Sequence, residues 1–133
     1  MITYETMVQG ERFYLLLGPF LISRKVRREL GMAISSDENY RWIVALDGER
    51  AVGFGAVELC GEAVQLRHAY VIPEARGQGI YGEMIRRRED LARAAGFTLA
   101  QTVAAPASVP ALEKHGYAAI GSRGQYTIME KTL

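Results

Sequence analysis

The apolar residues of this chain fall into runs and stripes that predict both strands and helices. Short runs rich in β-branched and aromatic residues, bounded by Gly, Pro, Asp or Ser, are typical of strands. They predict a sheet of about six to seven strands, at residues 2–8, 41–46, 50–59, 63–72, 97–104, 117–121 and 126–131. Apolar residues three to four positions apart, or short runs between breakers, predict helices at residues 10–17, 20–30, 80–95 and 111–115.

Glycine and proline set the expected ends of several elements. The pair Gly18-Pro19 is expected to end the first helix, because proline cannot continue a helix interior. The pair Asp47-Gly48 lies between two strand-like runs and predicts a hairpin. Gly53 and Gly55 interrupt the third predicted strand, which favours a bulge or a close approach of another group.

The longest helix connects two strands that must therefore run in parallel. It has an apolar stripe that includes Ile80 and Met84, and we interpret Arg86, Arg87 and Arg88 as its solvated side. A helix between two neighbouring strands makes them parallel, whereas the three strands before it form an antiparallel meander. The pattern therefore predicts a mixed, mostly antiparallel sheet.

Length and composition indicate one domain, residues 1–133, with one hydrophobic core. The net charge of +1 gives no general attraction to nucleic acid or membrane surfaces. No apolar stretch reaches the roughly 20 residues of a membrane span. Cys60 is the only cysteine, so no disulfide can form within the chain. These features favour a cytoplasmic protein without a membrane partner.

The most informative stretch is a glycine-rich turn between the strand at 63–72 and the helix at 80–95. Gly77, Gly79 and Gly82 stand in it, directly after Arg76. Glycine lets a ligand approach the main chain, and the first N–H groups of a helix have no partner within the helix. The helix dipole and the arginine add positive charge, so the turn is suited to an anion such as a pyrophosphate.

Two common phosphate-binding loops do not fit this turn. A Walker loop requires Gly-Lys-Ser or Gly-Lys-Thr, and no lysine follows Gly79. The glycines match the G-x-G-x-x-G spacing of dinucleotide-binding folds. However, only one strand–helix–strand unit can be drawn, and no acidic residue ends a second parallel strand. An unrelated nucleotide-binding domain therefore stays only as a third alternative.

The pattern V-x-P-x-x-R-G-x-G-I at residues 71–80, followed by an amphipathic helix, resembles the acyl-CoA-binding segment of the GNAT superfamily of N-acyltransferases. The phrase Glu-Lys-His-Gly-Tyr at 113–117 also resembles a motif of this family. The resemblance implies an α+β fold, an α/β/α sandwich with helices on both faces of the sheet. It also implies acetyl-CoA as the acyl-donor cosubstrate. The residues that it assigns to coenzyme A are Tyr70, Val71, Ile72, Arg76, Gly77, Gln78, Gly79, Ile80, Tyr81 and Gly82.

The chain departs from the family where acid–base residues are expected. Many members have a Tyr that protonates the leaving thiolate, and the matching position is Leu112. Some members carry an Asn at the position of Ala105, and histone-type members have a catalytic Glu at the position of Gln65. The resemblance therefore assigns no general acid or base.

The substitutes for these residues have no motif to support them. His68 lies on the central strand, and His115 lies three residues after Leu112. Both could titrate in the required range, but a packed or surface imidazole is the simpler interpretation of each. Glu58 is a further carboxylate near the strand, and no group of side chains has metal-ligand spacing.

The sequence thus predicts an N-acetyltransferase that uses acetyl-CoA and a primary amine. A small-molecule acceptor is favoured, with an amine of a protein or nucleic acid as alternatives, and a homodimer is compatible with the sequence. The alternative of another class is a non-catalytic acyl-CoA-binding module, which the residues Gln65 and Leu112 make reasonable.

Overall fold

One sheet of seven strands forms the centre of the molecule, and the computed structural model describes all residues, 1–133. The strands lie in the order β1-β2-β3-β4-β5-β7-β6. Their bounds are β1 Ile2–Met7, β2 Tyr40–Asp47, β3 Arg50–Glu58, β4 Val64–Val71, β5 Leu99–Ala104, β6 Ala118–Arg123 and β7 Tyr126–Thr132. Only the pair β4–β5 is parallel, which confirms the predicted mixed sheet.

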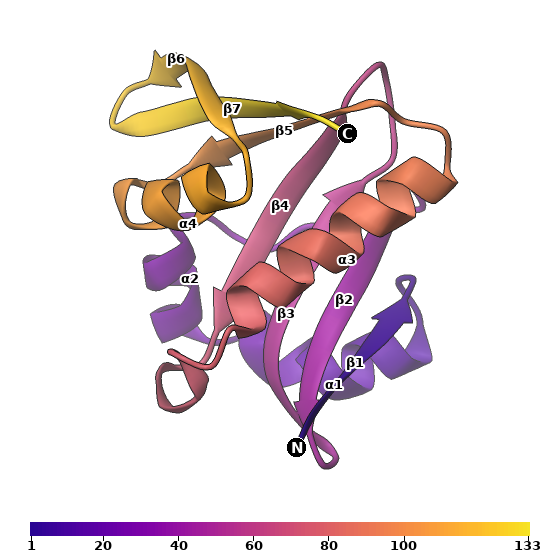
Figure 1. The fold of residues 1–133 in the computed structure, drawn as a ribbon. Helices are drawn as coiled ribbons and strands as arrows, with labels where there is room; N and C mark the ends of the chain where they lie inside the picture. The colour runs from indigo at the N-terminus through magenta and orange to yellow at the C-terminus, as the bar shows by residue number, and fades with distance from the viewer.

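Helices cover both faces of this sheet, as predicted. Their bounds are α1 Glu11–Leu21, α2 Arg24–Leu30, α3 Ile80–Ala94 and α4 Val109–Lys114, with short 3₁₀ turns at Pro73–Ala75 and Pro106–Ser108. Figure 1 shows α3 crossing one face over β2, β3 and β4, while α1 lies behind the sheet. The fold is the α+β sandwich that the sequence predicted, and none of its helices is both long enough and apolar enough to cross a membrane.

The prediction that Gly18-Pro19 ends the first helix is wrong. Helix α1 continues through Pro19 to Leu21, and α2 begins only at Arg24. Proline removes one hydrogen bond, to the carbonyl of Leu15 four residues earlier, and Leu15 is exposed, so water can replace that bond. The break comes at Ser23, whose side chain accepts a hydrogen bond from the N–H of Val26 and caps α2.

Two apolar clusters stabilise the two halves of the sheet. The larger contains 21 buried residues from β1 to β4, both N-terminal helices and the start of α3. The smaller contains 10 buried residues from β3, β4, β5, β7, α3 and α4. Tyr81 and Leu91 of α3 pack against both clusters, so this helix joins the two halves.

The cap at Ser23 provides a test of the boundary between α1 and α2. Ser23→Ala removes the only side-chain bond to the first turn of α2, and we expect a loss of about 1 kcal/mol in the free energy of unfolding, measured with urea. Ser108→Ala is the matched control, because Ser108 holds the same position before α4 but makes no capping bond. Equal losses in the two variants would contradict this account of the helix break.

Candidate active site between strands β4 and β5

Strand β4 separates from β5 in the middle of the sheet. The two strands pair only from Val64 to Leu66, opposite Ala100 to Thr102. On its other edge β4 stays paired with β3, but there Phe54 pairs with Tyr70 and Ala56 with Arg67. Gly55 therefore faces two residues of β4, His68 and Ala69, which is a β-bulge of the kind that the sequence indicated.

The separation of β4 and β5 opens a cleft that continues to the glycine-rich turn. The central cleft has a volume of about 310 Å³, and a groove of about 560 Å³ follows the end of β4 to the start of α3. The two hollows share the residues Glu29, Leu30, Ala69, Tyr81 and Ser108. A long ligand can therefore reach from the turn into the middle of the sheet.

The turn at the end of this groove leaves backbone N–H groups free. Gly77 and Gly79 have φ angles of +81° and +79°, and Gly79 is the N-cap of α3. No side chain caps this helix. No heavy atom lies within 4 Å of where a Cβ at either glycine would be, so the turn is open to a ligand. These are the features of an anion site at a helix N-terminus.

Arg76 already has partners within the protein. Its Nε donates to the carbonyl of Val71 at 2.9 Å, and its Nη2 lies 3.3 Å from Oε2 of Glu29 on α2. The hydroxyl of Tyr70 donates to the same carboxylate oxygen. Burial, and next the bond to Glu29, raise the pKa of Tyr70 to about 12, and the bond from Tyr70 lowers the pKa of Glu29. The phenol is therefore held neutral against an ionised carboxylate.

The backbone of β4 divides between the sheet and the groove. The N–H of Ile72 donates to the carbonyl of Val52 at 2.9 Å, so it faces β3. Backbone groups of an antiparallel strand alternate in direction, so those of Tyr70 face β3 and those of Val71 face the groove. The bond from Arg76 to the carbonyl of Val71 agrees with this alternation. Of the three backbone positions predicted to bind pantetheine, only Val71 has its polar groups on the open side.

Some of the other residues predicted to bind coenzyme A line the groove, and others lie outside it. Ile80 and Tyr81 line the groove, with Arg76 and the two glycines. Gln78 lies instead at a separate hollow beside Arg86 and Arg87. Gly82 lies against His115, and a Cβ there would be 2.8 Å from its Nε2, so this glycine permits helix packing. Gln78, Gly82 and Ile72 are thus outside the groove.

His68 is packed against two aromatic rings at the bulge. It is 8% exposed, and its ring stacks on Trp42 at a centroid distance of 5.9 Å and on Tyr40 at 6.1 Å. Its Nε2 lies 3.4 Å from the backbone N of Ser35, and its Nδ1 has no partner. Burial, and next the charge of Arg67, lower the pKa of His68 to about 4. Such an imidazole is neutral at pH 7 and is a poor proton acceptor.

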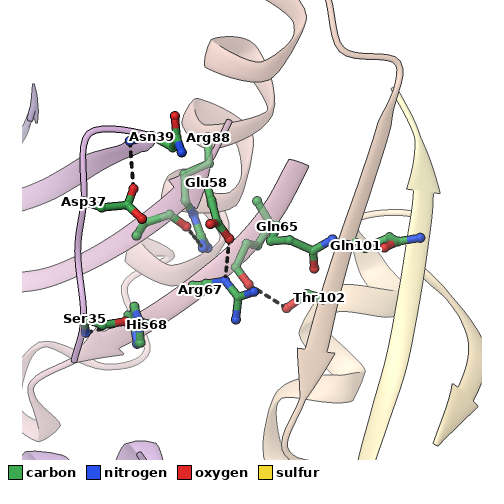
Figure 2. Close-up of polar contacts among 12 residues, drawn as sticks. Ser35, Asp37, Asn39, Glu58, Gln65, Arg67, His68, Arg88, Gln101 and Thr102 are labelled. Carbon is green, nitrogen blue, oxygen red and sulfur yellow. Dashed lines mark hydrogen bonds and ion pairs between the residues drawn. The ribbon is translucent and has the colours of Figure 1, made fainter. Parts of the chain in front are cut away.

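The positions of the usual acid and base hold groups that do not titrate. Nε2 of Gln65 donates to Oε1 of Gln101 at 3.0 Å, and Gln101 in turn donates to Glu130 at 2.7 Å. Leu112 is 2% exposed and belongs to the smaller apolar cluster. Figure 2 shows Gln65 and Gln101 on adjoining strands, with the ion pair of Arg67 and Glu58 beside them at 3.0 Å. His115 is the other histidine considered for proton transfer. Its pKa is lowered first by burial and then by the positive charge of Arg86.

The interpretation of Arg88 as a solvated residue is wrong. Arg86 and Arg87 are exposed, but Arg88 is 1% exposed and lines the central cleft. Its Nε donates to the carbonyl of Met84 and its Nη1 to that of Ala56, both at 3.1 Å. The signal was present in the sequence, because Ile80, Met84 and Arg88 are spaced four apart and so share one helix face.

Comparisons with known proteins identify the family and the fold of the chain. Residues 11–117 match the model of the acetyltransferase (GNAT) family, so the chain belongs to that family. No curated protein matches the chain.

Solved structures show the same fold at low sequence identity. Escherichia coli ElaA is 14% identical, with a TM-score of 0.81 over 98% of this chain and 99% of that one. An acetyltransferase from Thermus thermophilus is 16% identical, with a TM-score of 0.76 over 98% and 97%. The PaiA N-acetyltransferase from Thermoplasma acidophilum, in complex with coenzyme A, is 13% identical, with a TM-score of 0.71 over 98% and 99%.

The buried His68 provides a pH test of stability. Its pKa is about 4 in the folded protein and about 6.5 in the unfolded chain, so between these values the unfolded state binds more protons. Stability should therefore fall as the pH falls from 7 to 4.5, by roughly 1–2 kcal/mol after allowance for partial solvent access. Urea titrations at both pH values measure the change.

The variant for this test is His68→Asn, because Asn tolerates the positive φ of +54° at this position. We expect the variant to lose less stability than the wild type over the same pH range. His115→Asn is the control, and it should keep most of the pH dependence of the wild type. A full pH dependence in His68→Asn would show that other groups cause it.

Proposed function

We propose that this chain transfers an acetyl group from acetyl-CoA to a primary amine. The observation that supports the proposal most directly is the continuous groove between the free N–H groups after Gly79 and the cleft between β4 and β5. One end of the groove suits a pyrophosphate. The other end suits a thioester, which the amine acceptor must reach from the opposite face of the sheet. The residues present therefore fit an acyl-CoA.

In this proposal each part of the groove has a separate role. The N–H groups after Gly79 bind the pyrophosphate, and the backbone of Val71 pairs with the pantetheine arm. Arg76 contributes positive charge, although an incoming phosphate would share it with Glu29. Tyr81, which lines both hollows, packs beside the arm. Acetyl-CoA supplies the activated acyl group.

The chemistry requires positioning and charge stabilisation. The amine nitrogen attacks the thioester carbonyl carbon, the carbon–sulfur bond breaks, and its electron pair leaves with the sulfur. Backbone N–H groups at the bulge of His68 and Ala69 are our candidates for the developing oxyanion, because a bulge takes a residue out of the strand ladder. The proton lost from the nitrogen passes to solvent, because neither Gln65 nor Leu112 can accept it.

The acceptor enters from the face that carries α2. Residues of both charges line the central cleft there, including Glu29, Arg67 and Arg123. We favour a small-molecule amine, and an amine of a protein or nucleic acid is the alternative. The cytoplasmic location and the homodimer stay predictions.

A non-catalytic acyl-CoA-binding module is the second candidate function. It is favoured by one specific observation, the apolar and amide side chains of Leu112 and Gln65 where the family has its acid and base. Production of free thiol in the presence of candidate amines distinguishes the two functions, because a module binds acetyl-CoA without turnover.

The pyrophosphate site is tested with Gly79→Val. A branched side chain at this open glycine would block the approach of a phosphate to the N–H groups of α3. We expect binding of coenzyme A, measured by calorimetry, to weaken by several kcal/mol, the scale of lost charge-assisted hydrogen bonds.

The control for this variant is Gly61→Val, which separates backbone strain from loss of the site. Gly61 has the same φ of +79° and equally open surroundings, but lies in the turn before β4, outside the groove. It should have a similar effect on stability and leave the affinity unchanged. Unchanged affinity in a folded Gly79→Val variant would refute the site.

The missing base leads to a prediction for the pH profile. An alkylamine has a pKa near 10.4, so only a small fraction is neutral at pH 7. We expect kcat/KM for such an acceptor to keep rising through pH 8, because it follows the neutral amine in solution. His68→Ala and His115→Ala should each reduce kcat/KM by less than about tenfold, below the effect of a general acid or base.

A different profile would change this account. If kcat/KM levelled off near pH 6.5, and removal of one histidine moved that point, the histidine would be the base. A flat profile would instead indicate an acceptor of low pKa, such as an amine on an aromatic ring.

A further inference from the structure

Arg88 is a buried arginine without a carboxylate partner. It is 1% exposed, and no Asp or Glu oxygen lies within 4.0 Å of its guanidinium. The carboxylate of the next residue, Glu89, is already bound by Lys131 at 3.0 Å and by the hydroxyl of Tyr117 at 2.8 Å. A buried charge is unfavourable unless it is paired, so this arginine requires an explanation.

The side chain is held in one position with part of its charge unused. Two of the five N–H groups of Arg88 donate to the carbonyls of Met84 and Ala56, which leaves three without a partner. Its Cζ lies only 3.1 Å from where a Cβ of Gly55 would be, so the head lies flat against the bulged strand. The absence of a side chain at Gly55 makes this position possible.

The three N–H groups of Arg88 without a partner are on a side chain that lines the central cleft. Arg88, Tyr81 and Leu112 all line it, from the face of the sheet that α3 and α4 cover. Arg88 is nine residues beyond Gly79, which is roughly 13 Å along a helix at about 1.5 Å per residue. An extended pantetheine arm bound at the turn can span this distance, and it carries its sulfur at the far end.

We propose that Arg88 binds the sulfur of coenzyme A and stabilises the leaving thiolate, in place of the tyrosine that Leu112 replaces. The assignment depends on the proposed binding of an acyl-CoA. As the amine attacks and the carbon–sulfur bond breaks, the electron pair goes to sulfur, and the thiolate accepts hydrogen bonds from the guanidinium. The proton released by the amine goes to solvent, from which the thiolate takes one after it leaves.

This role suits an arginine rather than an acid. Burial lowers the pKa of the Arg88 guanidinium, but from so high an ordinary value that the group stays protonated and gives no proton to the sulfur. It contributes a fixed positive charge from a buried position, next to the atom on which negative charge develops. Such preorganised charges are among the strongest contributions to catalysis.

Other charges near the cleft must be considered in any titration of the sulfur. From α3 itself, Tyr81 and Glu89 are the ionisable groups near Arg88, and Tyr117 adds a phenol whose pKa burial raises. The other ionisable groups that line the cleft come from α2, β4, β6 and β7, and they are Glu29, Arg67, His68, Arg123 and Tyr126. Arg88 is the only cation among all of these that is fully buried.

The test is the pKa of the thiol of bound coenzyme A, which needs neither an acceptor nor turnover. Thiolate formation is followed by ultraviolet absorption, with the protein bound to desulfo-coenzyme A as the blank. A free thiol has a pKa of about 8.5, and a cation in contact should lower it by about one unit or more. Coenzyme A should correspondingly bind wild-type protein about tenfold more tightly, relative to desulfo-coenzyme A, at pH 9.5 than at pH 7.

Three variants assign the effect to Arg88. In Arg88→Met, which keeps the length of the side chain without its charge, the thiol should titrate near its free value. Arg88→Lys should keep part of the shift, because it keeps the charge. The matched control is Arg93→Met, which removes an exposed arginine from the same helix and should keep the whole shift.

The outcomes separate this proposal from the proposed function. If wild-type protein binds coenzyme A and the thiol titrates at its free value, Arg88 does not contact the sulfur, while acyl-CoA binding stands. A lowered pKa that persists in Arg88→Met assigns the effect to another group and also overturns the proposal. If coenzyme A does not bind, both proposals fail. If Arg88→Met does not fold, a thiol that titrates at its free value in the wild type still overturns the proposal, and a shift that is reduced in Arg88→Lys still assigns the effect to Arg88.

Discussion

The candidate site depends on one irregularity in the sheet, the bulge at which Gly55 of β3 faces His68 and Ala69 of β4. A bulge bends and twists its strand, and β4 loses its pairing with β5 directly before it, after Leu66. The cleft is thus lined by strand edges whose backbone groups are free to bind a ligand. His68 of the bulge packs against both Tyr40 and Trp42, which hold it in place.

The same irregularity explains how a charge can be buried on the other face of the sheet. Gly55 has no side chain, so the guanidinium of Arg88 lies directly against the strand and bonds to the carbonyl of Ala56. Glu89, next in the chain, is equally buried but neutralised by Lys131 of β7. Helix α3 therefore carries two buried charges side by side, of which one stabilises the fold and the other lines the cleft.

The groove is also joined to the N-terminal half of the chain through polar contacts. Glu29 of α2 accepts from Tyr70 of β4 and from Arg76 of the glycine-rich turn. An anion at the turn would compete with Glu29 for Arg76, whereas the N–H groups after Gly79 are free. In the proposed anion site the backbone of the turn is therefore the constant part, and the arginine is shared.

The sequence alone determined the features that depend on neighbouring residues. Alternation, turn residues and the glycine-rich turn before a helix predicted the order of elements, the mixed sheet and an anion site near Gly77 and Gly79. Gly53 and Gly55 also indicated a bulge or a close approach in β3, and the structure has the bulge at Gly55. The sequence could not show the direction in which each backbone group of β4 points, because that depends on pairing with β3. It therefore predicted one role for Tyr70, Val71 and Ile72, of which only Val71 has its backbone groups on the open side.

Tertiary structure decided what depends on residues far apart in the chain. Proline at position 19 was expected to end a helix, but the exposed position of Leu15 makes the lost bond tolerable. The spacing of Arg88 with Ile80 and Met84 places it on the helix face that packs on the sheet, but only the contact with Gly55 shows how its charged group fits there. Burial and charge are properties of the surroundings that the whole fold creates, and a local pattern does not contain them.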